Sequence, residues 1–346
     1  MPTSRKTDDS NKNAIIFEIQ RVFFLPHKHI FDEELIEGWK KSDRIDHCNI
    51  YFITVAKKYR FDLKRTSTNI LGELKTYVRI GENPAQRVIT HVHRCNSTLY
   101  HALHDKSFFG EVGFDFKVDR AASNEKELTI NVKTHPSLEP VPLVLLVENV
   151  LQAADCQLGI DGAPRIVYIG QSFRVFERLR SHSRINQTSA SLRDDEELHI
   201  NLVRFKIGYV GDYMGEGWKF FLHEKPRGSA VAKEKVSLLE RTLIAFFRPE
   251  LNDQHVETKL HKDSLVSGIV DRYDIDSISV GVGVHGPLGK FWSPRQSVTD
   301  EVATYSFVNP SSGFRSGIDI PALGHLAEKP LGTKKTEGNS PKKART

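Results

Sequence analysis

The chain has 346 residues, of which 39% are apolar, so it is expected to bury hydrophobic cores in two domains with tails. No apolar run approaches the ~18–20 residues of a membrane span, and the polar N-terminus lacks an apolar signal segment. The net charge of +5 equals the excess of Lys and Arg within residues 329–346 alone, which leaves the rest of the chain nearly neutral. A broadly basic surface is therefore not expected, and an anion site would have to be a local cluster.

The cysteines and the composition of the two ends indicate the compartment of the protein and the extent of its folded part. The three cysteines, Cys48, Cys95 and Cys156, are odd in number and far apart, which is typical of a reducing compartment. A cytoplasmic protein without a membrane partner is expected. Residues 1–13 and the basic segment 329–346 are expected to be disordered, because their composition cannot bury enough surface.

Residues 14–138 are expected to form a mixed α/β domain. Residues 14–24 and 49–59 are rich in β-branched and aromatic side chains and are predicted to be strands. Residues 32–42 have helical spacing of apolar side chains, and 109–119 with 126–134 read as a hairpin. The stretch KKYRFDLKR alternates aromatics with cations, as nucleic-acid surfaces do, so this domain is a candidate for target recognition.

Three prolines within residues 135–142 indicate a domain boundary. Residues 143–255 form the second expected domain, with strands at 143–150, 165–170 and 198–210, and residues 256–328 an extension with a strand at 277–284. A helix is expected after Ser172, and another at 234–248 that Pro249 ends. The expected fold class is α+β, and the second domain is expected to be a small antiparallel sheet with flanking helices.

A cationic stripe is predicted behind the strand RIVYIG. Residues four apart on a helix share a face, so Arg174, Arg178 and His182 would line up, with Arg180 adding charge nearby. Guanidinium groups bind phosphate oxygens two at a time, which suits a phosphate ligand. The other interpretation is a solvated helix face with Glu177 as a salt-bridge partner.

Glu240 is the second unusual residue. It lies in a helix that is apolar nearly all round, and a buried carboxylate costs several kcal/mol unless it is paired or binds a metal. Two interpretations stay open at this point. Glu240 either neutralises a buried arginine or holds a hard divalent cation such as Mg²⁺.

The ordered set of these residues resembles the GIY-YIG nuclease superfamily. The resemblance covers residues 143–255: VYIG at 167–170, then Arg178 and His182, then the segment ERTLIAFFRPELN with Glu240 and Asn252. Members of that family cut DNA phosphodiester bonds. The resemblance implies an endonuclease that requires Mg²⁺ or Mn²⁺, and double-strand cutting with one site per chain would usually need a homodimer.

The resemblance also implies roles for individual residues. Glu240 would be the sole metal-ligating carboxylate, and Arg178 would donate to the phosphate as negative charge builds. Tyr168 would lie against the attacking water, and His182 would relay or take its proton. The set expected to serve DNA binding is Arg174, Arg180 and Asn252, the last by tying the helix end to the site.

One departure from the family pattern affects the mechanism. The family's first motif places another tyrosine, in several members the proposed general base, on the strand before YIG, and residues 143–150 contain none. Either His182 is the base, or a phenol comes from elsewhere with Tyr209 as the nearest candidate, or the protein is an inactive fold that only binds DNA. A separate cluster with His91, His93 and Cys95 either binds zinc or is ordinary core and surface.

Overall fold

The computed structural model describes residues 14–34, 36–37, 48–95, 115–133, 139–154, 162–210, 230–252, 259–282, 290–296, 302–307 and 310–316. The expectations for residues 1–13, for residues 329–346 and for Cys156 lie outside these ranges. Cys48 and Cys95 are buried thiols that form no disulfide with each other, and burial raises the pKa of each to about 12. Within the described ranges, no helix is long and apolar enough to cross a membrane.

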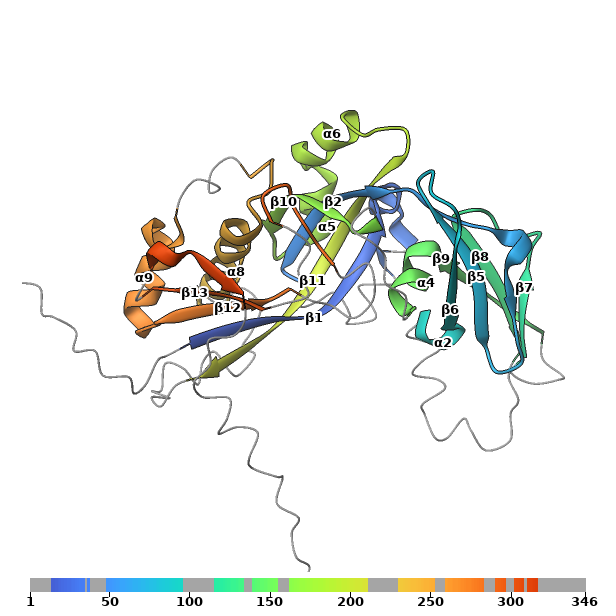
Figure 1. Ribbon diagram of the computed structural model, residues 1–346, viewed down its shortest axis with the longest axis horizontal. Helices are drawn as coiled ribbons and strands as arrows, with labels where there is room; N and C mark the ends of the chain where they lie inside the picture. Colours follow the sequence, from blue (N-terminus) through green and yellow to red (C-terminus); the bar gives the residue numbers. More distant parts are fainter. Residues whose placement is uncertain are drawn as a thin grey trace, which may run out of the picture.

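The central element is a seven-stranded mixed sheet (Figure 1). Its order is β10-β2-β11-β1-β12-β13-β14, and all neighbours are antiparallel except β1 and β12. The strands are β1 (Ala14–Pro26), β2 (Ile50–Lys57), β10 (Arg165–Gln171), β11 (Glu196–Val210), β12 (Ser277–Gly281), β13 (Val302–Ser306) and β14 (Phe314–Ser316).

Helices cover both faces of this sheet. Successive side chains of a strand point to opposite sides, so the two faces of a buried strand pack against different helices. Ile53 and Val55 of β2 pack in the cluster of α5 (Val175–Arg180), α6 (Ser183–Ala190) and η1 (His27–Phe31). Phe52, on the other face, packs in the cluster of α8 (Ala230–Phe247) and α9 (Ser264–Tyr273). Two further turns, η4 (Leu260–Lys262) and η6 (Pro310–Ser312), lie near the C-terminal strands.

Residues 58–164, called the insertion below, separate β2 from its sheet neighbour β10. The insertion forms two small antiparallel sheets at one end of the molecule, with Phe116 of the second sheet packed on Gly72 of the first (Figure 1). Its strands are β3 (Tyr59–Phe61), β4 (Ser67–Thr68), β5 (Glu73–Ile80), β6 (Gln86–His91), β7 (Asp115–Asp119), β8 (Glu127–Lys133) and β9 (Val141–Leu146). Its helical segments are η2 (Leu63–Arg65), α2 (Val92–Cys95) and α4 (Val147–Ala153).

The α+β class is confirmed: the chain combines a curled mixed sheet, small antiparallel sheets and flanking helices. The expected boundary at residues 135–142 does not separate two domains, because β1 and β2 pair with β10 and β11 across it. The expected strand at 143–150 is also wrong in part. β9 ends at Leu146, and the buried Val147, Val150 and Leu151 continue as helix α4.

Candidate functional site

Two tyrosines from adjacent strands face each other at the centre of the site. Tyr51 of β2 lies directly opposite Gly170 of β10, and Tyr168 lies two residues earlier on β10. The ring centroids of Tyr51 and Tyr168 are 6.2 Å apart, and their hydroxyl groups hydrogen-bond. Tyr51 is 1% exposed, whereas Tyr168 is half-buried. The chain therefore supplies a second phenol from a strand that precedes β10 by the length of the insertion.

Gly170 makes room for this pair. A Cβ atom at position 170 would lie 2.5 Å from both Cζ and the hydroxyl oxygen of Tyr51, and 2.8 Å from Cε1 of Tyr168. Contacts this short do not occur between non-bonded atoms, so any larger residue would displace a phenol. Gly170 was expected to stop the strand, but β10 continues through Gln171. The glycine is required by the packing of the tyrosines.

Arg178 lies at the phenols as the sequence predicts. Its guanidinium donates hydrogen bonds to both Tyr51 and Tyr168. Burial raises the pKa of each phenol above its usual value, and Arg178 opposes that rise. The guanidinium is thus the group in the site that favours a phenolate.

His182 completes one wall of the site. Its ring centroid lies 4.8 Å from that of Tyr168 and 5.7 Å from that of Tyr51, in edge-on geometry. Burial, Arg178 and Arg184 lower the pKa of His182 to about 4, so the ring is neutral at pH 7. Its Nδ1 accepts the backbone N–H of Arg184 at 3.2 Å, which leaves the proton on Nε2.

The Nε2 atom is therefore a donor, and it is buried without a partner among the described residues. A buried donor without an acceptor costs about 1–3 kcal/mol. The unpaired donor therefore indicates a place where a ligand or a water molecule accepts a hydrogen bond. A neutral ring that donates through Nε2 does not fit the role of general base. The interpretation of His182 as a proton acceptor is thus less suitable than that of a hydrogen-bond donor.

Glu240 projects from α8 toward the same group. The backbone N–H of Gln171 donates to its carboxylate, and Ser237, one turn earlier on α8, hydrogen-bonds the Gln171 side chain at 3.1 Å. Burial raises the pKa of Glu240 to about 7, although Arg241 opposes the rise. Within the described part of the chain Glu240 forms no salt bridge, and Arg241 is instead paired with Asp263 at 3.2 Å. The interpretation in which Glu240 neutralises a buried arginine is therefore wrong for the described residues.

Asn252 positions the strand that carries the tyrosine. Its Oδ1 accepts the N–H of Ile169 and its Nδ2 donates to the carbonyl of Ile169, both at 2.8 Å. The side chain is buried, and the pairing of β10 with β2 is irregular between Ile166 and Tyr168. Asn252 thus ties the end of α8 to the site, as expected. Its amide serves the backbone of β10 and does not face a ligand.

The expected cationic stripe is wrong as a feature of one helix. α5 begins at Val175 and ends at Arg180, and His182 is the N-cap of α6, so Arg174, Arg178 and His182 share no continuous helix. Arg174 is 81% exposed in its side chain and lies 3.6 Å from Glu177. Arg180 donates to the carbonyl of Ile30 at 3.4 Å, which holds η1 against α5. Of the expected cations, only Arg178 reaches the phenols.

Two other sequence candidates have different outcomes. His91 ends β6, while His93 and Cys95 lie in α2, so they do not share the face of a strand. Cys95 Sγ contacts the carbonyl of His91 at 3.5 Å, and no metal-binding group of the described residues includes these three side chains. The side chain of Tyr209 lies outside the described residues. Tyr51 is the second phenol that the structure brings to Tyr168.

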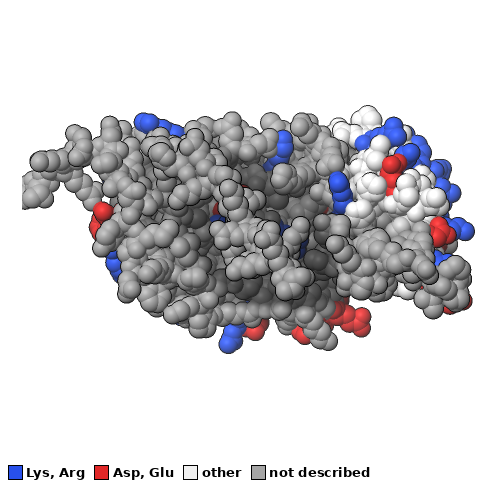
Figure 2. All heavy atoms as spheres, turned by 90° about the horizontal axis from the view of Figure 1, so that it is seen from below, with Lys and Arg blue, Asp and Glu red and all other residues white. Residues whose placement is uncertain are grey.

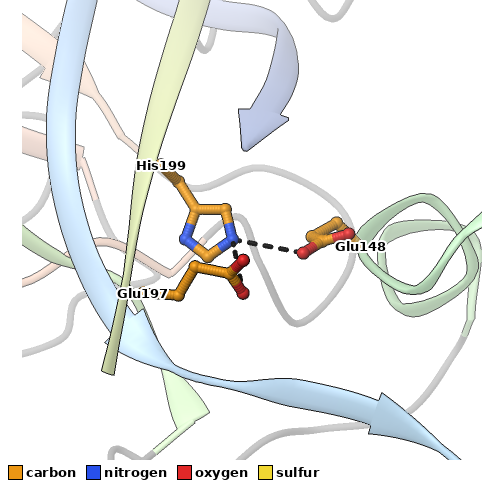
Figure 3. A group of neighbouring side chains, drawn as sticks. All are labelled: Glu148, Glu197 and His199. Carbon is orange, nitrogen blue, oxygen red and sulfur yellow. Dashed lines mark hydrogen bonds and ion pairs between the residues drawn. The ribbon is translucent and has the colours of Figure 1, made fainter. Parts of the chain in front are cut away.

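A separate buried cluster joins the insertion to the central sheet. Figure 3 shows Glu148 of α4 pointing at His199 of β11, with Glu197 beside it. Nε2 of His199 lies 3.2 Å from Oε1 of Glu148 and 3.9 Å from Oε2 of Glu197. Lys126 of the β7–β8 turn forms an ion pair with Glu197.

The Glu148 cluster has the ligand types of a metal site, but its charges are already matched. Two carboxylates meet one imidazole and one ammonium, and Lys126 pairs with Oε2 of Glu197, the oxygen that lies 3.9 Å from Nε2 of His199. Burial raises the pKa of Glu148, yet the hydrogen bond and charge of His199, with Lys126, outweigh it and hold that pKa below its ordinary value. The cluster therefore anchors the insertion through ion pairs.

We expect Glu148→Gln to lower the free energy of unfolding by about 3 kcal/mol at pH 7, because it removes the charged hydrogen-bond partner of the buried His199 ring. The wild type should lose this contribution as the pH falls below the ordinary carboxyl pKa, since the folded-state pKa is lower still. Urea unfolding at pH 7 and pH 4 measures both effects. Glu177→Gln, which removes an exposed ion pair, should change stability by less than about 0.5 kcal/mol. Equal stability of Glu148→Gln and wild type at pH 7 would contradict the anchor.

The site thus gathers two phenols, a guanidinium, a neutral imidazole and a half-buried carboxylate that forms no salt bridge with any described residue. Such a set can hold a hard cation, stabilise an anion and move a proton from water. Sequence reasoning found four of its members and missed Tyr51. No family model, curated protein or solved structure matches the chain.

Proposed function

We propose that the chain is a GIY-YIG-type endonuclease that hydrolyses DNA phosphodiester bonds. The observation that carries this proposal is the pairing of Tyr51 with Tyr168 around Gly170, with Arg178 donating to both. The triplet NIY at residues 49–51 then takes the place of the family's first motif, and the insertion separates it from YIG. The ground for an inactive fold was the missing tyrosine, and Tyr51 removes that ground.

Each side chain has a role that its surroundings support. Arg178 stabilises the negative charge that builds on the phosphate, because its guanidinium already lies at the two phenols. His182 donates through Nε2, the buried atom without a partner, to a phosphate oxygen or the attacking water. Tyr51 accepts the proton of that water once its own phenol proton has passed through the hydrogen-bonded hydroxyl of Tyr168 to solvent, and Arg178 opposes the rise in the Tyr51 pKa that burial causes.

The residues fit a divalent cation at Glu240. The carboxylate is half-buried, lacks a salt bridge among the described residues and has a raised pKa because its burial outweighs the opposing charge of Arg241. Carboxylate oxygen is the ligand that Mg²⁺ and Mn²⁺ prefer. A cation held by Glu240 would supply charge stabilisation at the phosphate and at the leaving 3′ oxygen.

The test is cleavage of supercoiled plasmid with Mg²⁺ or Mn²⁺, compared with EDTA. We expect Glu240→Ala and Arg178→Ala each to reduce the rate by at least about a hundredfold, since each removes transition-state stabilisation. Arg272→Ala is the matched control, because Arg272 is an exposed arginine of α9 that pairs with Glu234. Wild-type rates in both site variants would end the proposal, as would failure of the wild type to cut with either metal.

A further inference from the structure

The first sheet of the insertion presents a cationic outer face to solvent. Alternate residues of β5 point outward, and the residues directly opposite them on β3 and β6 share that face. Arg60 lies opposite Arg79, Tyr77 opposite Arg87, and Lys75 opposite Ile89. Together with Arg65, the basic residues Arg60, Lys75, Arg79 and Arg87 are called the cationic face below. Figure 2 shows Lys and Arg gathered at the end of the molecule that the insertion forms.

The neighbouring acids only partly neutralise the cationic face. Arg65 pairs with Asp62 at 2.7 Å, Lys75 with Glu73 at 3.1 Å and Arg60 with Glu125 at 3.7 Å. Arg79 and Arg87 are exposed and form no ion pair with any residue that the structure describes. Arg79 also lies directly opposite Arg60, and like charges in that position destabilise a sheet. An anion bound between them would relieve this repulsion.

An aromatic ring lies at the centre of the cationic face. The guanidinium carbon of Arg65 is 4.0 Å from the ring centroid of Tyr77, and Arg87 lies opposite Tyr77 on β6. Stacking on the ring fixes the orientation of the Arg65 fork. Fixed guanidinium forks on an exposed sheet suit the regularly spaced phosphates of a nucleic-acid backbone.

The position of the cationic face relative to the tyrosines suits a continuous duplex. Nine residues of nearly extended chain lead from Tyr51 to Arg60 through β2 and β3. Nine extended residues span at most about 30 Å, so Tyr51 and Arg60 lie within the length of about nine base pairs of each other. The Glu148 cluster anchors the insertion to β11, so this separation is held by buried contacts.

We propose that the cationic face binds the phosphate backbone of duplex DNA beside the cleavage site. This inference rests on the proposed nuclease function for the identity of the nucleic acid. It gives the insertion the role of substrate positioning, with Arg79 and Arg87 as the cations available for phosphates.

The test is binding of the full chain to a 30-base-pair DNA duplex in EDTA, by fluorescence anisotropy at several salt concentrations. We expect R79A/R87A to weaken binding on the order of tenfold and to reduce the slope of log affinity against log salt by about 2. R79K/R87K should keep most of the affinity, because phosphate contacts are charge contacts. K259A/K262A removes two exposed lysines at η4, beside α9 at the other end of the molecule, and should bind as wild type.

Equal DNA binding by R79A/R87A and wild type would refute the role proposed for the cationic face. Tighter binding of an RNA duplex of the same sequence would also refute it. The failures of the two proposals are distinguishable. Charge-dependent DNA binding without any cleavage refutes the nuclease alone. Cleavage with binding that is unchanged in R79A/R87A refutes the cationic face alone.

Discussion

Tyr51→Phe should abolish DNA cleavage while leaving the fold intact. The substitution removes one oxygen atom, which hydrogen-bonds Tyr168 and Arg178, and keeps the ring that packs against His182. Loss of a positioned proton acceptor lowers rates by about 10²- to 10⁴-fold. The measurement is single-turnover cleavage of a plasmid, with thermal unfolding to confirm that the variant is folded.

Tyr59→Phe is the matched control for Tyr51→Phe. Tyr59 is equally buried, and its hydroxyl donates to the carbonyl of Gly162 at 2.6 Å, away from the phenol pair. Losing that hydrogen bond should cost about 1 kcal/mol of stability and leave cleavage unchanged. Full activity of Tyr51→Phe, or equal losses in both variants, would refute the role assigned to Tyr51.

Gly170→Ala should inactivate the protein through packing alone. The added methyl group would stand 2.5 Å from the Tyr51 hydroxyl oxygen, so the phenol must move out of line with Tyr168 and Arg178. Overpacking of this kind costs about 1–3 kcal/mol, and a displacement near 1 Å can lower rates by about a hundredfold. Cleavage rates and urea unfolding measure the two effects.

Gly268→Ala gives the comparison that isolates the cause. Gly268 lies in α9, and an added Cβ meets nothing within 4 Å. A helical glycine replaced by alanine should raise stability by about 0.5–1 kcal/mol without affecting cleavage. If Gly170→Ala kept wild-type activity, the tyrosines would not depend on the space at position 170.

The local elements were largely predictable from the sequence. β-Branched and aromatic composition located β1 and β2, alternation of apolar and polar residues located β7 and β8, and Pro249 follows the last turn of α8 as expected. The single helix expected after Ser172 was wrong, because α5 ends at Arg180 and His182 caps a second short helix, α6. Periodicity reports which side chains are buried, and two short helices on one sheet face can preserve it.

The site was harder to assemble because its parts are far apart in the chain. Strands that are neighbours in a sheet are usually also neighbours in sequence, so the partner of β10 was sought at residues 143–150. Residues 49–59 were correctly read as a strand, but nothing in their pattern indicates pairing with β10. The remaining signal was the triplet NIY itself, whose isoleucine–tyrosine order matches the first family motif. The packing role of Gly170 could not be predicted from the sequence, because a glycine is required there only when Tyr51 lies beside it.

The insertion has a consequence for how the chain folds. The contact between Tyr51 and Gly170 closes a loop of more than a hundred residues, so it is a strongly non-local contact. Closing such a loop costs about 4 kcal/mol of chain entropy, unless the two insertion sheets form first and bring their ends together. We therefore expect catalytic competence to arise late in refolding. Replacing residues 58–164 with a short turn, which would make β2 and β10 a hairpin, should accelerate it.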